Sequence, residues 1–149
     1  MFNKAEPGSK EYKDALYQLG YAYDIKDQPE DAITAYSKAL EISPDDMDLY
    51  FNLGRLYYKQ EKYEKTIESF QKVIDSNPDD FDANMNVASA YYQMQKWNEA
   101  IPYYEKAVQI QPDNSNAWYF LGMVYVRAGL PEKGQEAFDK ADEVKGGEE

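Results

Sequence analysis

Three prolines, Pro44, Pro78 and Pro112, follow one another at a constant interval of 34 residues in this chain of 149 residues. The residues around each proline repeat the same order of apolar, small and aromatic side chains. A constant period of this length is typical of one supersecondary unit copied in tandem. A single copy cannot bury its apolar face alone, so the copies must stack on one another. The period therefore predicts a repeat architecture.

Each copy contains two sets of residues with helical spacing. The first set falls at i, i+3, i+4 and i+7, on one face of a helix: Leu16, Leu19, Gly20 and Tyr23; Tyr50, Leu53, Gly54 and Tyr57; Asn84, Val87, Ala88 and Tyr91; Trp118, Leu121, Gly122 and Tyr125. The second set is Ala32, Tyr36 and Ala39; Thr66, Phe70 and Val73; Ala100, Tyr104 and Ala107; Gly134, Phe138 and Ala141. Each copy is therefore predicted to hold two helices, and the short loops at 27–28, 61–62, 95–96 and 129–130 make them antiparallel.

Small residues mark the places where the two helices of a copy come closest. The small column is Gly20, Gly54, Ala88 and Gly122, and we expect it to leave room for an aromatic ring of the paired helix. The recurrent proline then prevents the second helix from running on.

Helix starts are marked by capping residues and by proline. Ser9 is predicted to cap the first helix, and the aspartates that follow the prolines are predicted to cap the first helix of each later copy: Asp45, Asp79 and Asp113. Pro29 and Pro131 suit the first position of a helix. Pro102 suits it less well, because a helix that began near Trp97 would hold this ring in its second turn. We therefore expect a late start or a kink there.

This pattern resembles the tetratricopeptide repeat family, whose signature W-x2-L-G-x2-Y, A-x3-F, P is matched in order by all four copies from Lys13 onward. Asn84, Thr66 and Gly134 are the departures. The resemblance implies an all-α, right-handed solenoid of antiparallel helix pairs in which the first helix of each pair lines a concave groove. It predicts a leader and the start of the first helix at 1–12 and a single domain at 13–148, with repeats at 13–46, 47–80, 81–114 and 115–148.

The last copy differs from the others on the face that would receive a further repeat. Earlier copies present Ile33 and Leu40, or their aliphatic equivalents, where the last has Gln135 and Asp142. Polar residues there indicate solvent, so this helix is predicted to cap the array, with residues 146–149 as a disordered tail. The alternative is a fragment of a longer array, because terminal repeats are generally atypical.

Composition narrows the classes of function. A net charge of −12 disfavours nucleic acid and anionic membranes. No apolar run reaches the roughly 20 residues that span a bilayer, and the polar start does not resemble a signal peptide, so a soluble, cytoplasmic protein is expected. The chain has no histidine or cysteine, and its aspartate runs lack the glycine and glutamate of a calcium loop. We therefore expect no enzyme activity, metal or cofactor.

Function is then expected on the face of each first helix that lies opposite the packed face. The predicted peptide-binding residues are Gln18, Tyr21, Asn52, Arg55, Asn86, Tyr119, Phe120, Met123 and Arg127. Gln18, Asn52 and Asn86 share a column, and their amides can donate to and accept from a peptide backbone. This is similar to the asparagine ladders of peptide-binding members of the family. A solvated polar face without a ligand remains open, as does a packing role for the nearby aromatics.

The same face also carries acids in the first turn, namely Asp14, Asp48 and Asp82, which are explained by capping and by the helix dipole. The lysines of the chaperone carboxylate clamp are missing, so capture of such a tail is not expected. The sequence favours a scaffold that binds an extended or helical segment of another protein. The alternative is a self-associating structural module, and a monomer or weak dimer is expected.

Overall fold

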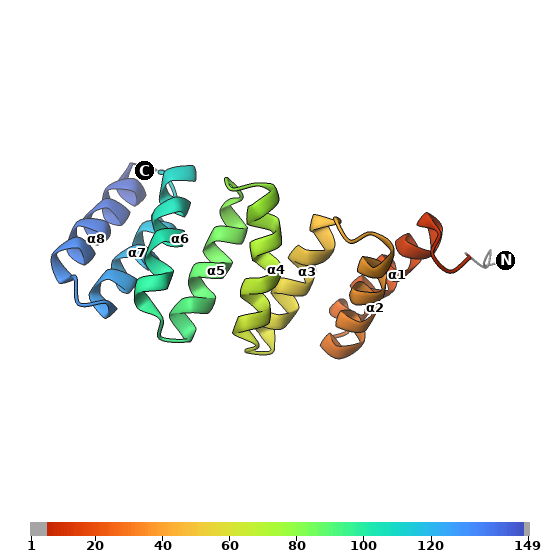
Figure 1. Cartoon of the computed structure of the whole chain (residues 1–149). Coiled ribbons are helices and arrows are strands. Elements are labelled where there is room, and N and C mark those ends of the chain that lie inside the picture. The colour runs from red at the N-terminus through yellow and green to blue at the C-terminus, as the bar shows by residue number, and fades with distance from the viewer. Residues whose placement is uncertain (1–5, 148–149) are drawn as a thin grey trace. The chain divides into compact units, whose positions relative to one another are not determined.

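The computed structural model describes residues 6–147, and these residues form eight helices and no strand. Figure 1 labels them in chain order: α1 Lys10–Ile25, α2 Pro29–Ile42, α3 Met47–Lys59, α4 Tyr63–Ser76, α5 Phe81–Gln93, α6 Trp97–Ile110, α7 Ser115–Arg127 and α8 Pro131–Gly146. Two helices per copy confirm the predicted all-α repeat. Of the predicted leader, residues 1–5 lie outside the described residues.

The chain divides into two compact units, Met1–Ser69 and Phe70–Glu149, with the boundary inside α4. We call them unit 1 and unit 2. In unit 1, α2 packs against both α1 and α3; in unit 2, α5 pairs with α6, α6 packs on α7, and α7 pairs with α8. The helix pairs of each unit can be followed in Figure 1.

The first helix of every copy begins at a side-chain cap. Ser9 accepts a hydrogen bond from the backbone N–H of Tyr12, as predicted. In the later copies the predicted aspartates were wrong by one residue, because the caps are Asp46, Asp80 and Asn114. The residue directly after each proline instead lies in the turn, and the next residue takes the extended backbone that a cap requires.

Two prolines stand at the first position of a second helix, as expected, and a third lies inside one. Pro29 and Pro131 open α2 and α8, as predicted. The late start expected near Pro102 was wrong, because α6 begins at Trp97 and contains Pro102. Proline has no N–H to offer the carbonyl of Asn98, one turn earlier. Asn98 is exposed, so water can satisfy that carbonyl.

The turn inside each copy uses a left-handed residue. Asp27, Glu61, Gln95 and Gly129 have φ between 55° and 82°. In each turn the next N–H bonds back to a tyrosine carbonyl five residues earlier, as in the pair Lys96 N and Tyr91 O at 2.9 Å. This is the Schellman arrangement, which satisfies carbonyls at the end of a helix.

Each unit has its own apolar core. In unit 1 the core contains Leu16, Tyr36, Leu49, Leu53 and Leu56, and in unit 2 it contains Tyr104, Val108, Leu121, Val124 and Tyr125. In both units a glycine of the small column leaves room for an aromatic ring of the paired helix, as predicted. A Cβ added to Gly20 would stand 2.7 Å from the Tyr36 ring, and one added to Gly122 would stand 2.6 Å from the Phe138 ring.

Two of the three departures from the repeat pattern, Asn84 and Gly134, have local explanations. The amide of buried Asn84 donates to the carbonyl of Pro78 at 3.1 Å, and the indole N–H of Trp118 does the same to Pro112 at 2.9 Å, 34 residues later. Gly134 allows close packing, because its Cβ would lie 2.6 Å from Cγ2 of Val126.

Two residues of the predicted cap are exposed, whereas one residue of the predicted packed face is not buried. Gln135 and Asp142 are both exposed on α8. The predicted disordered tail was wrong at its start, because Gly146 is the last residue of α8; residues 148 and 149 lie outside the described residues. Leu19, predicted to be packed, is 44% exposed.

Candidate functional site

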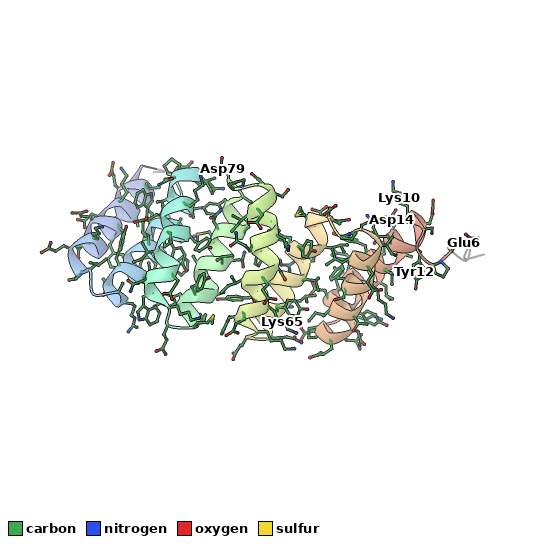
Figure 2. The ribbon with its side chains drawn as sticks, in the orientation of Figure 1. Glu6, Lys10, Tyr12, Asp14, Lys65 and Asp79 are labelled. Atoms are coloured by element: carbon green, nitrogen blue, oxygen red, sulfur yellow. The ribbon has the colours of Figure 1, made fainter. Side chains whose placement is uncertain are left out.

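In unit 1 the predicted site residues come from α1 and α3. We call Gln18, Tyr21, Asn52 and Arg55 the unit 1 surface. The Nδ2 of Asn52 donates to the Tyr17 hydroxyl at 3.2 Å, so the amide links α3 to α1. Gln18 is exposed and Tyr21 is 54% exposed. Near the start of α1, where Figure 2 labels Lys10, Tyr12 and Asp14, Lys13 reaches the cap residue Asp46 of α3 at 3.0 Å.

Arg55 of this surface and the nearby Lys59 share one carboxylate that the sequence pattern did not single out. Asp24 on α1 lies 3.9 Å from Nη2 of Arg55 and 3.5 Å from Nζ of Lys59. Its side chain is only 14% exposed. Neither base pairs with Asp14 or Asp48, the acids that the sequence placed on this face. Asp24 escaped notice because tyrosine or valine occupies its column in the later copies.

A buried hydroxyl lies beneath the unit 1 surface. Tyr36 on α2 is 0% exposed, and its hydroxyl has no hydrogen-bond partner. Its ring centroid lies 5.6 Å from that of Tyr17. Burial is the main cause that raises the pKa of Tyr36 to about 12, and the charge of Asp24 adds to it. A buried group without a partner is costly.

In unit 2 the predicted site residues come from α5 and α7. We call Asn86, Tyr119, Phe120, Met123 and Arg127 the unit 2 surface. The Nδ2 of Asn86 donates to the backbone carbonyl of Asp82 at 2.7 Å, within its own helix. The predicted amide column therefore has three different local arrangements: an exposed Gln18, Asn52 bonded to a tyrosine, and Asn86 bonded to backbone.

An aromatic cluster forms the apolar part of the unit 2 surface. The Phe120 ring stacks on Tyr104 of α6 with centroids 6.0 Å apart and planes 11° apart. Tyr119 meets Phe120 edge-on at 6.1 Å and lies 5.4 Å from Phe138. Tyr119 is nevertheless 52% exposed and Phe120 40% exposed. These two rings are held in place by neighbours while one side of each remains accessible.

The other aromatics beside the predicted site have packing partners. Tyr58 meets Tyr63 edge-on at 5.6 Å, and Tyr92 meets Trp97 at 4.9 Å. Met85 packs against the unit 2 core. These contacts are of the packing kind that the sequence analysis kept open for the flanking aromatics.

The described residues contain neither a candidate metal site nor a candidate membrane span. Within 6–147 there is no group of three or more acidic side chains placed to hold a metal ion. No helix of that range is both long and apolar enough to cross a membrane.

Comparison with known proteins agrees with the repeat pattern. Three family models match: a TPR repeat at residues 25–61 and tetratricopeptide repeats at 51–115 and 93–148. No curated protein sequence matches the chain.

Solved structures of one protein, MamA, share the fold. One crystal structure of MamA is 27% identical, covers 97% of this chain and 83% of its own, and superposes with a TM-score of 0.88. Another is 27% identical, with coverages of 95% and 76% and a TM-score of 0.86. A MamA structure from Desulfovibrio magneticus RS-1 is 24% identical, with coverages of 91% and 77% and a TM-score of 0.85. The helix pairs and the similarity to these structures show that the chain is an α-helical repeat solenoid. The three family matches show that it belongs to the tetratricopeptide repeat family.

Proposed function

We propose that this protein is an interaction scaffold that binds an extended or helical segment of a partner protein through the unit 1 and unit 2 surfaces. Membership of the tetratricopeptide repeat family supports the scaffold role. The observation that carries the proposal is the pair of exposed rings, Tyr119 and Phe120, held against Tyr104 and Phe138. Aromatic residues fixed by their neighbours are typical anchors of protein interfaces.

The unit 2 surface supplies apolar contacts with an adaptable edge. Phe120 and Tyr119 offer ring faces, and the half-buried Met123 is one helical turn from Phe120. Methionine adapts to varied shapes because its side chain is flexible and polarisable. Arg127, one turn further along α7, is exposed and has no ion pair among the described side chains. An apolar segment followed by an acidic residue would suit this arrangement.

The unit 1 surface supplies polar contacts. The Nδ2 of Asn52 is engaged with Tyr17, which leaves its carbonyl oxygen to accept from a backbone N–H of the partner. The long contact between Arg55 and Asp24, 3.9 Å, holds the guanidinium weakly, and that side chain is 49% exposed. Arg55 can therefore turn to a partner carbonyl at little cost.

The test begins with capture of a partner from the native cell extract and continues with titration of that partner by calorimetry. Asn52→Ala combined with Asn86→Ala is expected to weaken binding about thirtyfold, since each of the two lost hydrogen bonds costs about 1 kcal/mol. Phe120→Ala is expected to weaken binding at least as much. Circular dichroism must show unchanged helix content. Equal affinities for the wild type and the double variant would refute the amide contacts, and unchanged binding by Phe120→Ala would refute the anchor.

A second candidate, self-association, is favoured by one observation on α1. Ala15, Leu19 and Ala22 follow each other at helical spacing and are all exposed. Their equivalents in the later copies are buried, as Leu53, Val87 and Leu121 show. Sedimentation at micromolar concentration distinguishes the candidates: a stable dimer that Leu19→Lys dissolves would favour assembly, and a monomer would reject it.

A further inference from the structure

A pocket of about 330 Å³ lies between α7 and α8 in unit 2. It is lined by Trp118, Leu121, Tyr125, Lys133, Glu136, Ala137 and Lys140. At 100° per residue, Trp118, Leu121 and Tyr125 fall on the side of α7 opposite Phe120, Met123 and Arg127. The pocket is therefore separate from the unit 2 surface, and its occupant goes beyond the function proposed above.

The preceding copy shows what fills the equivalent place. There the ring of Tyr103 stacks on Tyr91, with centroids 5.8 Å apart and planes 29° apart. The Tyr103 hydroxyl donates to Oε1 of Gln71 at 3.2 Å. The Tyr103 ring therefore packs on the face of Tyr91, and its hydroxyl bonds to the side-chain oxygen of Gln71.

The last copy keeps the tyrosine face and an acceptor oxygen, but it lacks the ring of Tyr103. Residues 34 positions further on are Tyr125 for Tyr91, Glu105 for Gln71 and Ala137 for Tyr103. The Tyr125 hydroxyl donates to Oε1 of Glu105 at 2.5 Å, so one carboxylate oxygen still lacks a partner among the described residues. Ala137 is much smaller than the tyrosine of the preceding copy, and it lines the pocket observed here together with Trp118, which replaces Asn84.

In the second and last copies, which lack the ring, a lysine lies over the tyrosine face. The Nζ of Lys133 lies 5.6 Å from the Tyr125 ring centroid. In the second copy Lys65, labelled in Figure 2, lies 5.4 Å from the Tyr57 ring. The third copy, which contains Tyr103, has Glu99 in this column. Lys133 is exposed, so an incoming ring can displace it, since an exposed cation–π contact contributes only about 0.5–1 kcal/mol.

We propose that this pocket binds a tyrosine side chain of a protein partner, with the phenol ring on Tyr125 and the phenol hydroxyl donating to the unoccupied oxygen of Glu105. Trp118 and Leu121 supply the apolar wall. The carboxylates of Glu105 and Glu136 repel an anionic ring substituent, so the unmodified phenol is the form that fits.

The probe is N-acetyl-L-tyrosinamide, titrated into the full chain and followed by the indole N–H resonance of Trp118. Its indole N–H donates to the Pro112 carbonyl, and Trp97 is the only other tryptophan, so the signal is readily assigned. A saturable shift is expected in the wild type. Ala137→Tyr, which supplies the missing ring, is expected to abolish it. No saturable shift up to the solubility limit, or an unchanged shift in Ala137→Tyr, would overturn the proposal.

Three controls keep the outcome interpretable. Ala137→Leu also fills the pocket and is expected to block the probe, which protects the test if Ala137→Tyr does not fold. N-acetyl-L-phenylalaninamide is expected to bind about fivefold more weakly, because it lacks the hydroxyl. Glu105→Ala should weaken the tyrosine probe similarly, whereas Glu105→Gln should preserve binding because Gln71 is the acceptor in the preceding copy. Equal binding of both probes would overturn the hydroxyl contact.

Discussion

Two tyrosines in equivalent places differ in whether their buried hydroxyl has a partner. The hydroxyl of Tyr104 lies 3.1 Å from Oγ of Ser89, whereas that of Tyr36 has none, because Tyr21 occupies the position of Ser89. Phenylalanine already fills this column at Phe70 and Phe138.

Tyr36→Phe is therefore expected to raise the free energy of unfolding by about 1 kcal/mol, because it removes a polar group that folding desolvates without compensation. Tyr104→Phe is the matched variant and is expected to lower it by a similar amount. Urea denaturation of the two variants measures both effects. A loss of stability in Tyr36→Phe would show that its hydroxyl has a bonded partner.

Alkaline pH provides an independent check on Tyr36. Because its folded pKa is raised from 10.0 to about 12, the folded state retains this proton more tightly than the unfolded chain. The associated stability is complete below pH 10 and is lost as the pH rises toward 12. Tyr103 and Tyr125, whose pKa values are also raised by burial, add to the same decline. The decline in Tyr36→Phe should be shallower than in the wild type, and parallel curves would contradict the assignment.

Single-residue environments were the part of the candidate site that the sequence predicted least well. Helical spacing assigned Gln18, Asn52 and Asn86 to one column, but it could not show that Asn86 bonds to its own helix or that Asn52 bonds to Tyr17. The pairing of Asp24 with two bases depends on side-chain reach between α1 and α3, which periodicity does not encode.

At the scale of the helical element, the turns inside the copies impose a backbone cost. Gln95 has φ of 59°, and residues with a Cβ adopt this region at a cost of about 1 kcal/mol. Its side chain is exposed. Gln95→Gly is expected to stabilise the chain by about 0.5–1 kcal/mol. The reverse change, Gly129→Ala, should destabilise it by about 1 kcal/mol. Thermal denaturation of both variants tests the pair, and shifts of the same sign would contradict it.

Pro102 gives α6 a second element-level prediction. Pro102→Ala restores an N–H for the carbonyl of Asn98, and both residues are exposed. The free energy of unfolding is expected to rise by about 1–3 kcal/mol, since proline is unfavourable inside a helix. Chemical denaturation measures the change. No gain would mean that the cost of proline in the helix is offset by the lower conformational entropy that proline gives the unfolded chain.

The 34-residue period predicted the number, order and pairing of the helices. It predicted the residues at which the helices begin less accurately. Asp45 and Asp46 are chemically identical caps, so composition could not decide between them; backbone conformation did. The start of α6 at Trp97 shows that the pattern shared by all copies outweighed the local preference of one proline.

Across the whole molecule, the cost of a substitution depends on which copy contains it. Leu19, Leu53 and Leu121 share a column, but Leu19 is 44% exposed and the other two are 4% and 3% exposed. The later residues are covered by a helix of the preceding copy, and no described helix covers Leu19.

Leu121→Ala is expected to lower the free energy of unfolding by about 2–5 kcal/mol, as for a buried leucine, whereas Leu19→Ala should cost under about 1 kcal/mol. Urea titrations followed by circular dichroism measure the difference. Equal costs would mean that another surface covers Leu19 in solution, and a concentration-dependent midpoint would identify that surface as a second molecule.

The exposed stripe of Ala15, Leu19 and Ala22 also makes one end of the chain easier to lengthen than the other. An engineered helical hairpin joined ahead of α1, with aliphatic residues like Ile33 and Leu40 on its second helix, would pack on this exposed stripe. A hairpin appended after α8 would meet Gln135 and Asp142 instead. Grafting new modules onto this scaffold should therefore proceed from its amino end.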